Sequence, residues 1–450
     1  MKKILLASTI ITIAIASTIV LLTQHDAFNN GEKKQEIYVG VAYCGNTIED
    51  GKLLIDKVKG YTNLFVLQSG ELQRDFESVN ELGDYAVAAG MSFLPYFGTY
   101  IKQTFSTWLE TAKQRWGDRL LGIYYGDEPG GKMLDDYVEF EKTIDGDSIT
   151  KTRYGDIKVE KPDGVVIHYE IGGNINLYQP ENTLTGTVAI YATFFPNGTI
   201  TANGPTSNLN VATTYESLNA TRPLKDINEA AQKFLGRDQN NIEYLHNSTK
   251  VFTSDYAIPF FDYLAGYDVV LSQIGWNLTF AQQIAQIRGA ANLQHKDWGT
   301  MITWKYDTPP YLDRGPEILN QMRSAYQCGA KYIVLFNYFD IATSQDTIRE
   351  EHYRALESFW NDVVQNPNVV QGSIKADSAM VLPKNYGWAM RWENDKIWGI
   401  FNPDETTQRL WDLRQQAFTN NDLKIDVVYE DPDFPYPTEY YNIYQERLSP

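Results

Sequence analysis

Short apolar runs alternate with amphipathic stretches along most of this chain. The runs resemble strands buried on both faces of a parallel sheet, and the stretches between them carry apolar residues at helical spacing. The runs predicted as strands are residues 37–43, 63–68, 91–96, 120–126, 251–256, 267–274, 298–305 and 332–337. The helices predicted between them include residues 81–89, 105–116, 281–291 and 316–328. Eight alternating strand and helix units predict an α/β fold, a (β/α)8 TIM barrel over residues 36–366.

The regular spacing breaks after the fourth unit. Residues 145–222 are rich in Thr, Asn, Tyr, Val and Gly, and their alternating runs and short glycine turns predict an inserted antiparallel β element. Because this element interrupts the loop after the fourth strand, we expect it to overhang the mouth of the barrel. There it could wall a cleft, bind a polymer or pack laterally. A helical pattern from Asp226 resumes the barrel.

Residues 367–450 predict a small C-terminal α/β subdomain. It follows a long helix predicted near residues 345–364. Within it the pattern predicts strands over residues 379–382, 397–401 and 423–429, and a helix over residues 405–419. The Tyr- and Pro-rich end, residues 432–450, is expected to wrap the surface.

The end of the fourth strand is the most informative segment for chemistry. Its apolar run stops at Asp127, Glu128 and Pro129, which two glycines follow. Barrel enzymes build their active sites at the carboxyl ends of strands. Alternation along a strand would turn Tyr124 and Glu128 toward the interior, whereas Asp127 would brace a neighbouring loop. Glu128 is therefore the first candidate for a catalytic acid, and a solvated acidic turn is the alternative.

The triplet from Asp127 to Pro129 resembles the fourth-strand ending of the large retaining superfamily of TIM-barrel glycoside hydrolases. There an Asn-Glu-Pro or Asp-Glu-Pro triplet supplies the acid/base glutamate. The resemblance implies that barrel fold and an acid/base role for Glu128. It also implies a nucleophilic glutamate at the end of strand seven, where this chain reads TMITWKYD and offers only Asp307.

The second carboxylate is therefore left open among Asp255, Asp307 and Asp340. Retaining chemistry needs carboxyl groups ~5–5.5 Å apart, and inverting chemistry needs ~6.5–9.5 Å. Lys305 beside the acids could lower the pKa of a neighbour, or it could belong to a site that binds without cleaving.

Other predicted strand ends carry amides, aromatic rings and a lysine. Amides bond sugar hydroxyls and rings stack on pyranose faces, so these side chains are candidates for substrate binding. The candidates are Tyr43, Gln68, Tyr96, Tyr124, Gln273, Trp276, Trp304, Lys305, Asn337 and Tyr338.

The net charge and the absence of several motifs argue against other classes of function. The net charge of −18 argues against a nucleic-acid partner. The sequence has no CxxC, HExxH or clustered histidines, so no metal site is expected. It also lacks a Walker loop and a GxGxxG fingerprint after a strand, so no cofactor is expected, and without a GxSxG elbow nothing supports acyl transfer by a serine hydrolase.

The first 35 residues predict a membrane anchor and a tether. Two lysines precede the uncharged residues 4–22, which are close to the roughly 20 residues needed to span a bilayer. We expect an uncleaved signal anchor in the cell membrane, a single pass with the C-terminal domain outside, and a polar tether over residues 23–35. A cleaved signal peptide and a secreted protein are the alternative. Potential N-glycosylation sites fit a glycoprotein on the outer surface; they are Asn197, Asn219, Asn247 and Asn277.

Together these features predict a membrane-anchored extracellular glycoside hydrolase that acts on a surface or environmental glycan through carboxylate acid/base chemistry. The alternative is a non-catalytic surface barrel that binds carbohydrate or protein. The sequence indicates neither the glycan nor the oligomeric state.

Overall fold

A computed structural model describes most of the chain from residue 37 onward. The described residues are 37–98, 105–135, 138–144, 146–152, 157–163, 165–169, 174–178, 184–189, 192–194, 200–202, 224–276, 278–306, 309–340 and 345–446. Within these ranges, no helix is long and apolar enough to cross a membrane. The predicted anchor and tether lie outside the described residues, so both stay predictions.

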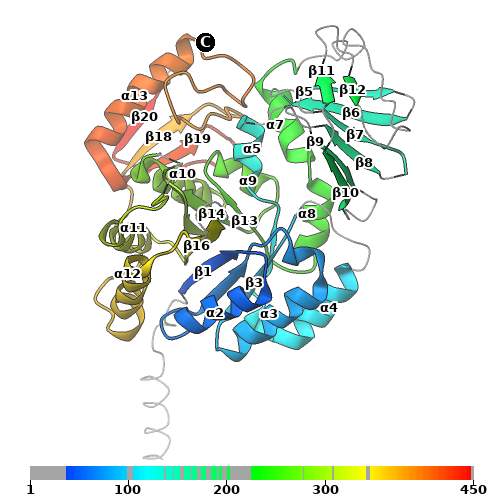
Figure 1. The fold of residues 1–450 in the computed structure, drawn as a ribbon. Helices are drawn as coiled ribbons and strands as arrows, with labels where there is room; N and C mark the ends of the chain where they lie inside the picture. Colours follow the sequence, from blue (N-terminus) through cyan, green and yellow to red (C-terminus); the bar gives the residue numbers. More distant parts are fainter. Residues whose placement is uncertain are drawn as a thin grey trace, which may run out of the picture. The chain divides into compact units, whose positions relative to one another are not determined.

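Eight parallel strands close into a barrel (Figure 1). They are β1 (Tyr38–Cys44), β2 (Leu64–Leu67), β3 (Ser92–Phe97), β4 (Ile123–Tyr125), β13 (Val251–Asp255), β14 (Val269–Ile274), β15 (Asp297–Ile302) and β16 (Tyr332–Asp340). Each strand pairs with the next in this order, and β16 returns to β1 with Tyr332 opposite Tyr38. The predicted (β/α)8 barrel is confirmed by this closed pairing.

Helices follow the strands around the barrel. They are α2 (Ile48–Val58), α3 (Phe76–Ala88), α4 (Phe105–Trp116), α5 (Pro129–Asp135), α7 (Ile227–Gly236), α8 (Gln239–His246), α9 (Pro259–Leu264), α10 (Phe280–Leu293), α11 (Gly315–Gln327) and α12 (Glu350–Trp360). Several begin at side-chain caps; Asp75 accepts hydrogen bonds from two amides of the first turn of α3. The helix predicted near residues 345–364 begins later, because Gln345–Asp346 forms a short strand, β17, beside the end of β16.

Alternate side chains of the strands fill the barrel interior. One apolar cluster includes Tyr38, Leu64, Leu94, Tyr124 and Phe252, each buried. Burial of each such large side chain is worth ~1.5–3 kcal/mol. The interior is therefore a packed core, and only residues at the carboxyl ends of the strands remain for a site.

The insertion after β4 is an antiparallel β-sheet wherever it is described. Its strands are β5 (Val138–Ile144), β6 (Asp147–Thr152), β7 (Ile157–Glu160), β8 (Val166–Tyr169), β9 (Asn174–Tyr178) and β10 (Leu184–Ala189), paired in sequential order. A separate hairpin joins β11 (Ala192–Phe194) and β12 (Ile200–Ala202). The antiparallel character agrees with the sequence pattern, although the sheet begins before residue 145. That it overhangs the barrel mouth stays a prediction.

The C-terminal segment contains a three-stranded parallel sheet with α13 (Glu405–Asn421). The strands β18 (Ser378–Leu382), β19 (Ile425–Tyr429) and β20 (Asn442–Gln445) lie in the order β19-β18-β20. The predicted strand over residues 397–401 is wrong, because Trp398 and Gly399 have positive φ angles of 56° and 70° that break an extended backbone. Within the tail predicted to wrap the surface, β20 adds a strand to this sheet, and its residues are exposed or partly exposed.

Candidate active site

A hydrogen-bonded group of side chains lies at the carboxyl end of β4. The hydroxyl of Tyr124, whose side chain is buried in the barrel, donates to Oδ1 of Asp127 at 2.5 Å. Ser254 Oγ and Gln68 Nε2 donate to the same oxygen at 3.2 and 3.3 Å. Tyr96 packs edge-on against Tyr124, with ring centroids 5.2 Å apart. Three donors on one oxygen fix Asp127 at the end of the barrel core.

This position of Asp127 corrects the alternation argument. The strand ends at Tyr125, and Gly126 and Glu128 then adopt positive φ angles of 64° and 52°. Two left-handed residues interrupt the strict alternation that a strand would continue. As a result Asp127 bonds lumen-facing groups instead of bracing a neighbouring loop, and Glu128 reaches the same region by a turn of the backbone.

Glu128 lies half-buried beside this group. Its amide donates to the carbonyl of Ser254 at 2.9 Å, and Gln273 hydrogen-bonds its carboxylate. Burial first, and then the charge of Asp127, raise the pKa of Glu128 to about 7, although Lys132 and the Gln273 bond oppose the shift. Near neutral pH, Glu128 can therefore hold the proton that a general acid needs.

Gln273 on β14 connects Glu128 to aromatic rings. Its Nε2 donates to Ser254 Oγ at 2.8 Å, and its Oε1 accepts from the indole Nε1 of Trp276 at 2.7 Å. Trp276 has a positive φ of 53° and is 41% exposed. The hydrogen bond thus fixes an exposed ring next to the acid.

The rings continue around the strand ends. Trp276 stacks on Trp304, with centroids 6.3 Å apart and an interplanar angle of 26°, and Trp304 packs against Tyr338 at 5.1 Å. Tyr256, beyond β13, packs against Trp276 with ring centroids 5.8 Å apart. We call Tyr256, Trp276, Trp304 and Tyr338 the aromatic arc. Flat apolar faces with polar edges suit the faces of pyranose rings.

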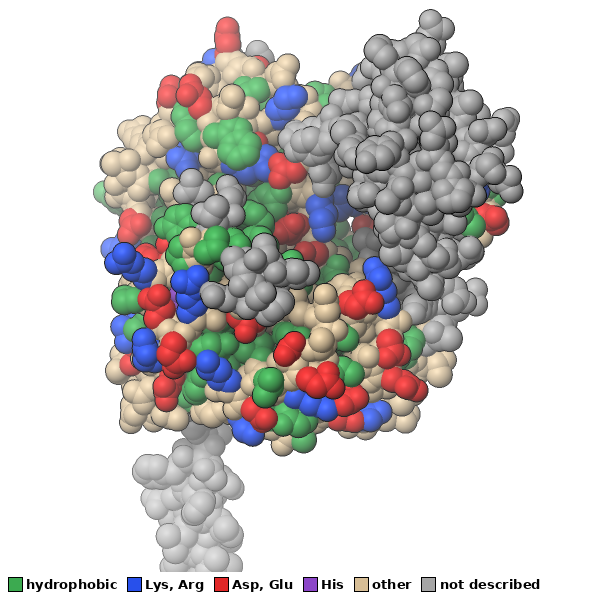
Figure 2. Space-filling model, in the orientation of Figure 1, with side chains coloured by type: hydrophobic (Ala, Val, Ile, Leu, Met, Phe, Trp, Pro, Cys, Tyr) green, Lys and Arg blue, Asp and Glu red, His purple; other side chains and the backbone are tan. Residues whose placement is uncertain are grey.

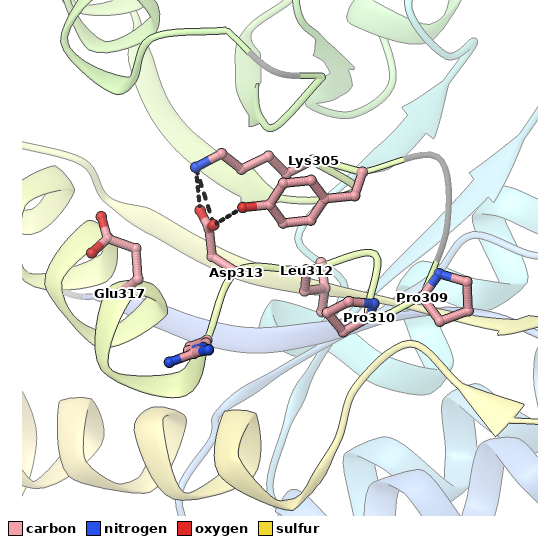
Figure 3. Close-up of a pocket in the computed structure, with 8 residues that line it drawn as sticks. Lys305, Pro309, Pro310, Leu312, Asp313 and Glu317 are labelled. Carbon is pink, nitrogen blue, oxygen red and sulfur yellow. Dashed lines mark hydrogen bonds and ion pairs between the residues drawn. The ribbon is translucent and has the colours of Figure 1, made fainter.

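The loop after β15 carries an ion pair where the resemblance implied a glutamate. Lys305 Nζ donates to both carboxylate oxygens of Asp313 at 3.0 Å, and Tyr306 and Gln321 donate to the same carboxylate. A cavity of about 560 Å³ opens here (Figure 3). Its lining residues are Lys305, Tyr306, Pro309, Pro310, Leu312, Asp313, Arg314 and Glu317. Because three donors make four hydrogen bonds to Asp313, this carboxylate is a structural partner of Lys305.

Three of the proposed site residues are engaged in hydrogen bonds within the protein. Tyr43 points to the outer face of β1, where its hydroxyl donates to the carbonyl of Thr47 at 2.6 Å. Asn337 is buried and donates to Asp346 at 3.1 Å. Asp255 is 1% exposed, and its carboxylate accepts backbone amides. All three side chains are thus bonded to groups of the protein itself.

The other two candidates for the second carboxylate stay untested. Asp307 lies outside the described residues. Asp340 is the last residue of β16, with its backbone opposite Gln345, and its side chain is not described. Both therefore remain predictions.

Sequence reasoning missed Ser254 and Tyr256. Ser254 connects Tyr124, Asp127 and Gln273 through one hydroxyl. A polar residue in phase with Phe252 on a buried strand was the available signal. Tyr256 directly follows β13. Aromatic residues at the ends of other strands were chosen as binding candidates, so the same rule could have found it.

Neither the surface charge nor the arrangement of potential metal ligands indicates a further part of this site. Acidic and basic side chains are interspersed over the face shown in Figure 2. Among the residues that the structure describes, no group of three or more His, Cys, Asp or Glu side chains is placed to hold a metal ion. The expected absence of metal, cofactor and nucleic acid stays a prediction.

Comparisons with known proteins give distant similarities of fold. No protein-family model and no curated protein matches this chain. A polyextremophilic beta-galactosidase from the Antarctic haloarchaeon Halorubrum lacusprofundi is 10% identical, with 90% of this chain and 68% of that chain covered and a TM-score of 0.49. GH5_18 from Streptomyces cattleya, solved in complex with GlcNAc, is 9% identical, with 92% and 99% covered and a TM-score of 0.47. The barrel assignment rests on the strand pairing of this chain itself.

Proposed function

We propose that this chain is a glycoside hydrolase that is anchored in the membrane and acts outside the cell on a surface or environmental glycan. The observation that carries the proposal is the position of Glu128. Its carboxyl group, with a pKa of about 7, lies at the end of β4 and shares Gln273 with the exposed ring of Trp276. A proton donor beside a sugar-stacking surface is what cleavage of a glycosidic bond requires.

In the proposed mechanism, Glu128 donates its proton to the glycosidic oxygen as the bond from that oxygen to the anomeric carbon breaks. Asp127, held by Tyr124, Ser254 and Gln68, keeps negative charge next to Glu128 and so favours its protonated form. A carboxylate from Asp307 or Asp340 would act as base or nucleophile on the other face of the sugar. Asp255 is left out of that role because its oxygens accept backbone amides.

The aromatic arc should contribute to glycan affinity. We expect Trp276→Ala to weaken binding of an oligosaccharide about tenfold, since loss of a stacked ring costs ~0.5–1.5 kcal/mol beyond its buried area. Trp276 is 41% exposed, so the substitution removes little core packing. Calorimetric titration would measure the affinity, and Tyr441→Ala, at an 87% exposed ring of the C-terminal tail, is the control. Equal losses of affinity in both variants would argue against a role of the aromatic arc in glycan binding.

The raised pKa of Glu128 sets an expected pH dependence. The acid form is the active form, so it is present below a pKa of about 7 and is lost as the pH rises through that value. We expect kcat/KM to fall tenfold per pH unit above about pH 7. A rate that stays constant from pH 6 to about pH 9 would remove Glu128 as the acid.

The test of the function is a panel of polysaccharides and oligosaccharides given to the protein and to Glu128→Gln. New reducing ends should form from at least one glycan with the unmodified protein, and the variant should bind that glycan but release far fewer ends. Cleavage at equal rates by both proteins would contradict the proposal.

The second candidate is a barrel that binds carbohydrate without cleaving it. The ion pair between Lys305 and Asp313, at the strand end where a nucleophilic glutamate was implied, favours it. It predicts glycan binding that Trp276→Ala weakens, with no reducing ends from either protein.

A further inference from the structure

The loop that carries Glu128 is fastened to the end of β13. Asp255, the last residue of that strand, accepts the amide of Gly130 at 2.5 Å and that of Gly131 at 3.0 Å. It also accepts the amide of Ala257, two residues further along its own chain, at 2.9 Å. The amides of Gly130 and Gly131 belong to the first turn of α5, which begins directly after Glu128. The carboxylate at the end of β13 thus caps the first turn of this helix.

Both glycines are required by the space around them. A Cβ on Gly130 would lie 2.6 Å from Ile258 Cγ1, and a Cβ on Gly131 would lie 2.3 Å from the ring of Tyr256. The backbone of α5 can approach Asp255 only because these side chains are absent. The close packing of α5 against residues 255–258 therefore explains why two glycines come after the acidic triplet.

The far end of α5 is held as well. Asp135 accepts a hydrogen bond from the hydroxyl of Tyr256 and one from Arg391 at 2.8 Å. Since the amide of Glu128 also donates to the carbonyl of Ser254, the loop is held on both sides of Glu128. Small movements of a proton donor cost large factors in rate, so such a fixed loop suits a reacting group.

We propose that Asp255 is a positioning residue whose buried carboxylate holds the Glu128 loop through the amides of Gly130 and Gly131. The inference rests on the proposed role of Glu128 as the acid. The charged groups near Glu128 are Asp127, Lys132, Asp135 and Asp255. Burial is the largest cause of the raised pKa of Glu128, so a loop released by removal of the Asp255 carboxylate should expose Glu128 and lower its affinity for its proton.

Two further observations show how deeply Asp255 is buried. Asp255 and Glu128 influence each other, and burial raises the pKa of Asp255 to about 7 although its amide donors oppose the shift. Behind Asp255, the fully buried Asp262 on α9 has a pKa well above its usual range, through burial and the charge of Asp255. Both oxygens of the Asp255 carboxylate accept backbone amides, which an amide side chain with a single acceptor oxygen could not do. The carboxylate is therefore needed to hold the loop of Glu128.

The test compares Asp255→Asn with Asp268→Asn. Asp268 is the matched control, since it also accepts a backbone amide of β13, that of Val251 at the other end of the strand. Carbon-13 NMR of labelled glutamate, with Glu128 assigned from Glu128→Gln, would follow its titration without any substrate. We expect the midpoint near pH 7 to fall by about one unit or more in Asp255→Asn and to stay in place in Asp268→Asn. An unchanged midpoint in a folded Asp255→Asn protein would overturn the inference.

Gly131→Ala is the second variant, because it keeps the charge of Asp255 but places a methyl group against Tyr256. On a cleaved glycan we expect both Asp255→Asn and Gly131→Ala to lower kcat at least tenfold with little change in KM. A kcat for Gly131→Ala within about twofold of the unmodified protein would contradict the positioning role. If no glycan is cleaved, the proposed function fails, while the NMR titration still decides whether Asp255 controls Glu128.

Discussion

Replacing Glu128 by glutamine is expected to lower kcat on the natural glycan by ~10²–10⁴ while leaving glycan affinity nearly unchanged. Loss of a positioned general acid typically costs factors of this size. Glutamine has almost the same shape and can keep a hydrogen bond to Gln273, but it cannot transfer a proton to the leaving oxygen. Below pH 7 the carboxyl group is already largely uncharged, so the substitution also removes little charge.

The control for this variant is Glu357→Gln, at an exposed position of α12. It makes the same chemical change on the outside of the barrel and should leave kcat and affinity unchanged. A variant at Glu128 that keeps more than about half of the activity would show that another group donates the proton.

Replacing Arg288 by alanine is expected to lower the free energy of unfolding by ~3–5 kcal/mol. Arg288 on α10 is buried, and its Nε donates to Asp426 on β19 at 2.6 Å. Its remaining nitrogens donate to the carbonyls of Ile374, Leu423 and Ile425. The variant would leave the charge of Asp426 and these carbonyls without their donor in a buried contact between the barrel and the C-terminal sheet.

Denaturant unfolding would measure this loss. Arg409→Ala is the matched control, because Arg409 pairs with Glu446 and Glu405 but its side chain is 48% exposed, and such pairs are worth ~0–1 kcal/mol. Gly289 lies in the same contact between α10 and β19. No side chain fits there, because a Cβ would lie 2.2 Å from the carbonyl oxygen of Val427. Similar losses of unfolding free energy in the two arginine variants would mean that the buried pair of Arg288 and Asp426 does not stabilise the contact between the barrel and the C-terminal sheet.

The barrel could be predicted because buried parallel strands have a strong sequence signature. Their apolar runs follow from burial on both faces, and each predicted run overlaps an observed strand. The helix over Phe105–Trp116 was predicted to the residue, since its apolar spacing ends at the glycine that follows. Strand β20 was missed because Tyr and Pro dominate its surroundings, and it pairs only through long-range contact with β18.

The site was predictable only in part. Strand ends bring together Gln68, Tyr124, Glu128, Gln273 and Trp276, because the carboxyl ends of the parallel strands meet at one end of the barrel. Alternation failed beyond Tyr125, because the positive φ angles of the following residues change the direction of the backbone. The hydrophobic pattern of the sequence does not reveal such angles. It also could not show that Asp255 bonds the amides of a helix whose sequence position is 125 residues away.

The most direct test of the account compares the protein with Glu128→Gln on two substrates that share one sugar. One substrate has a dinitrophenyl leaving group, which needs no proton, and the other has a second sugar, which needs one. The account predicts a rate ratio of ~10²–10⁴ for the sugar leaving group and close to one for dinitrophenyl, provided that cleavage of the bond limits both rates. Equal ratios for both substrates would contradict Glu128 as the general acid.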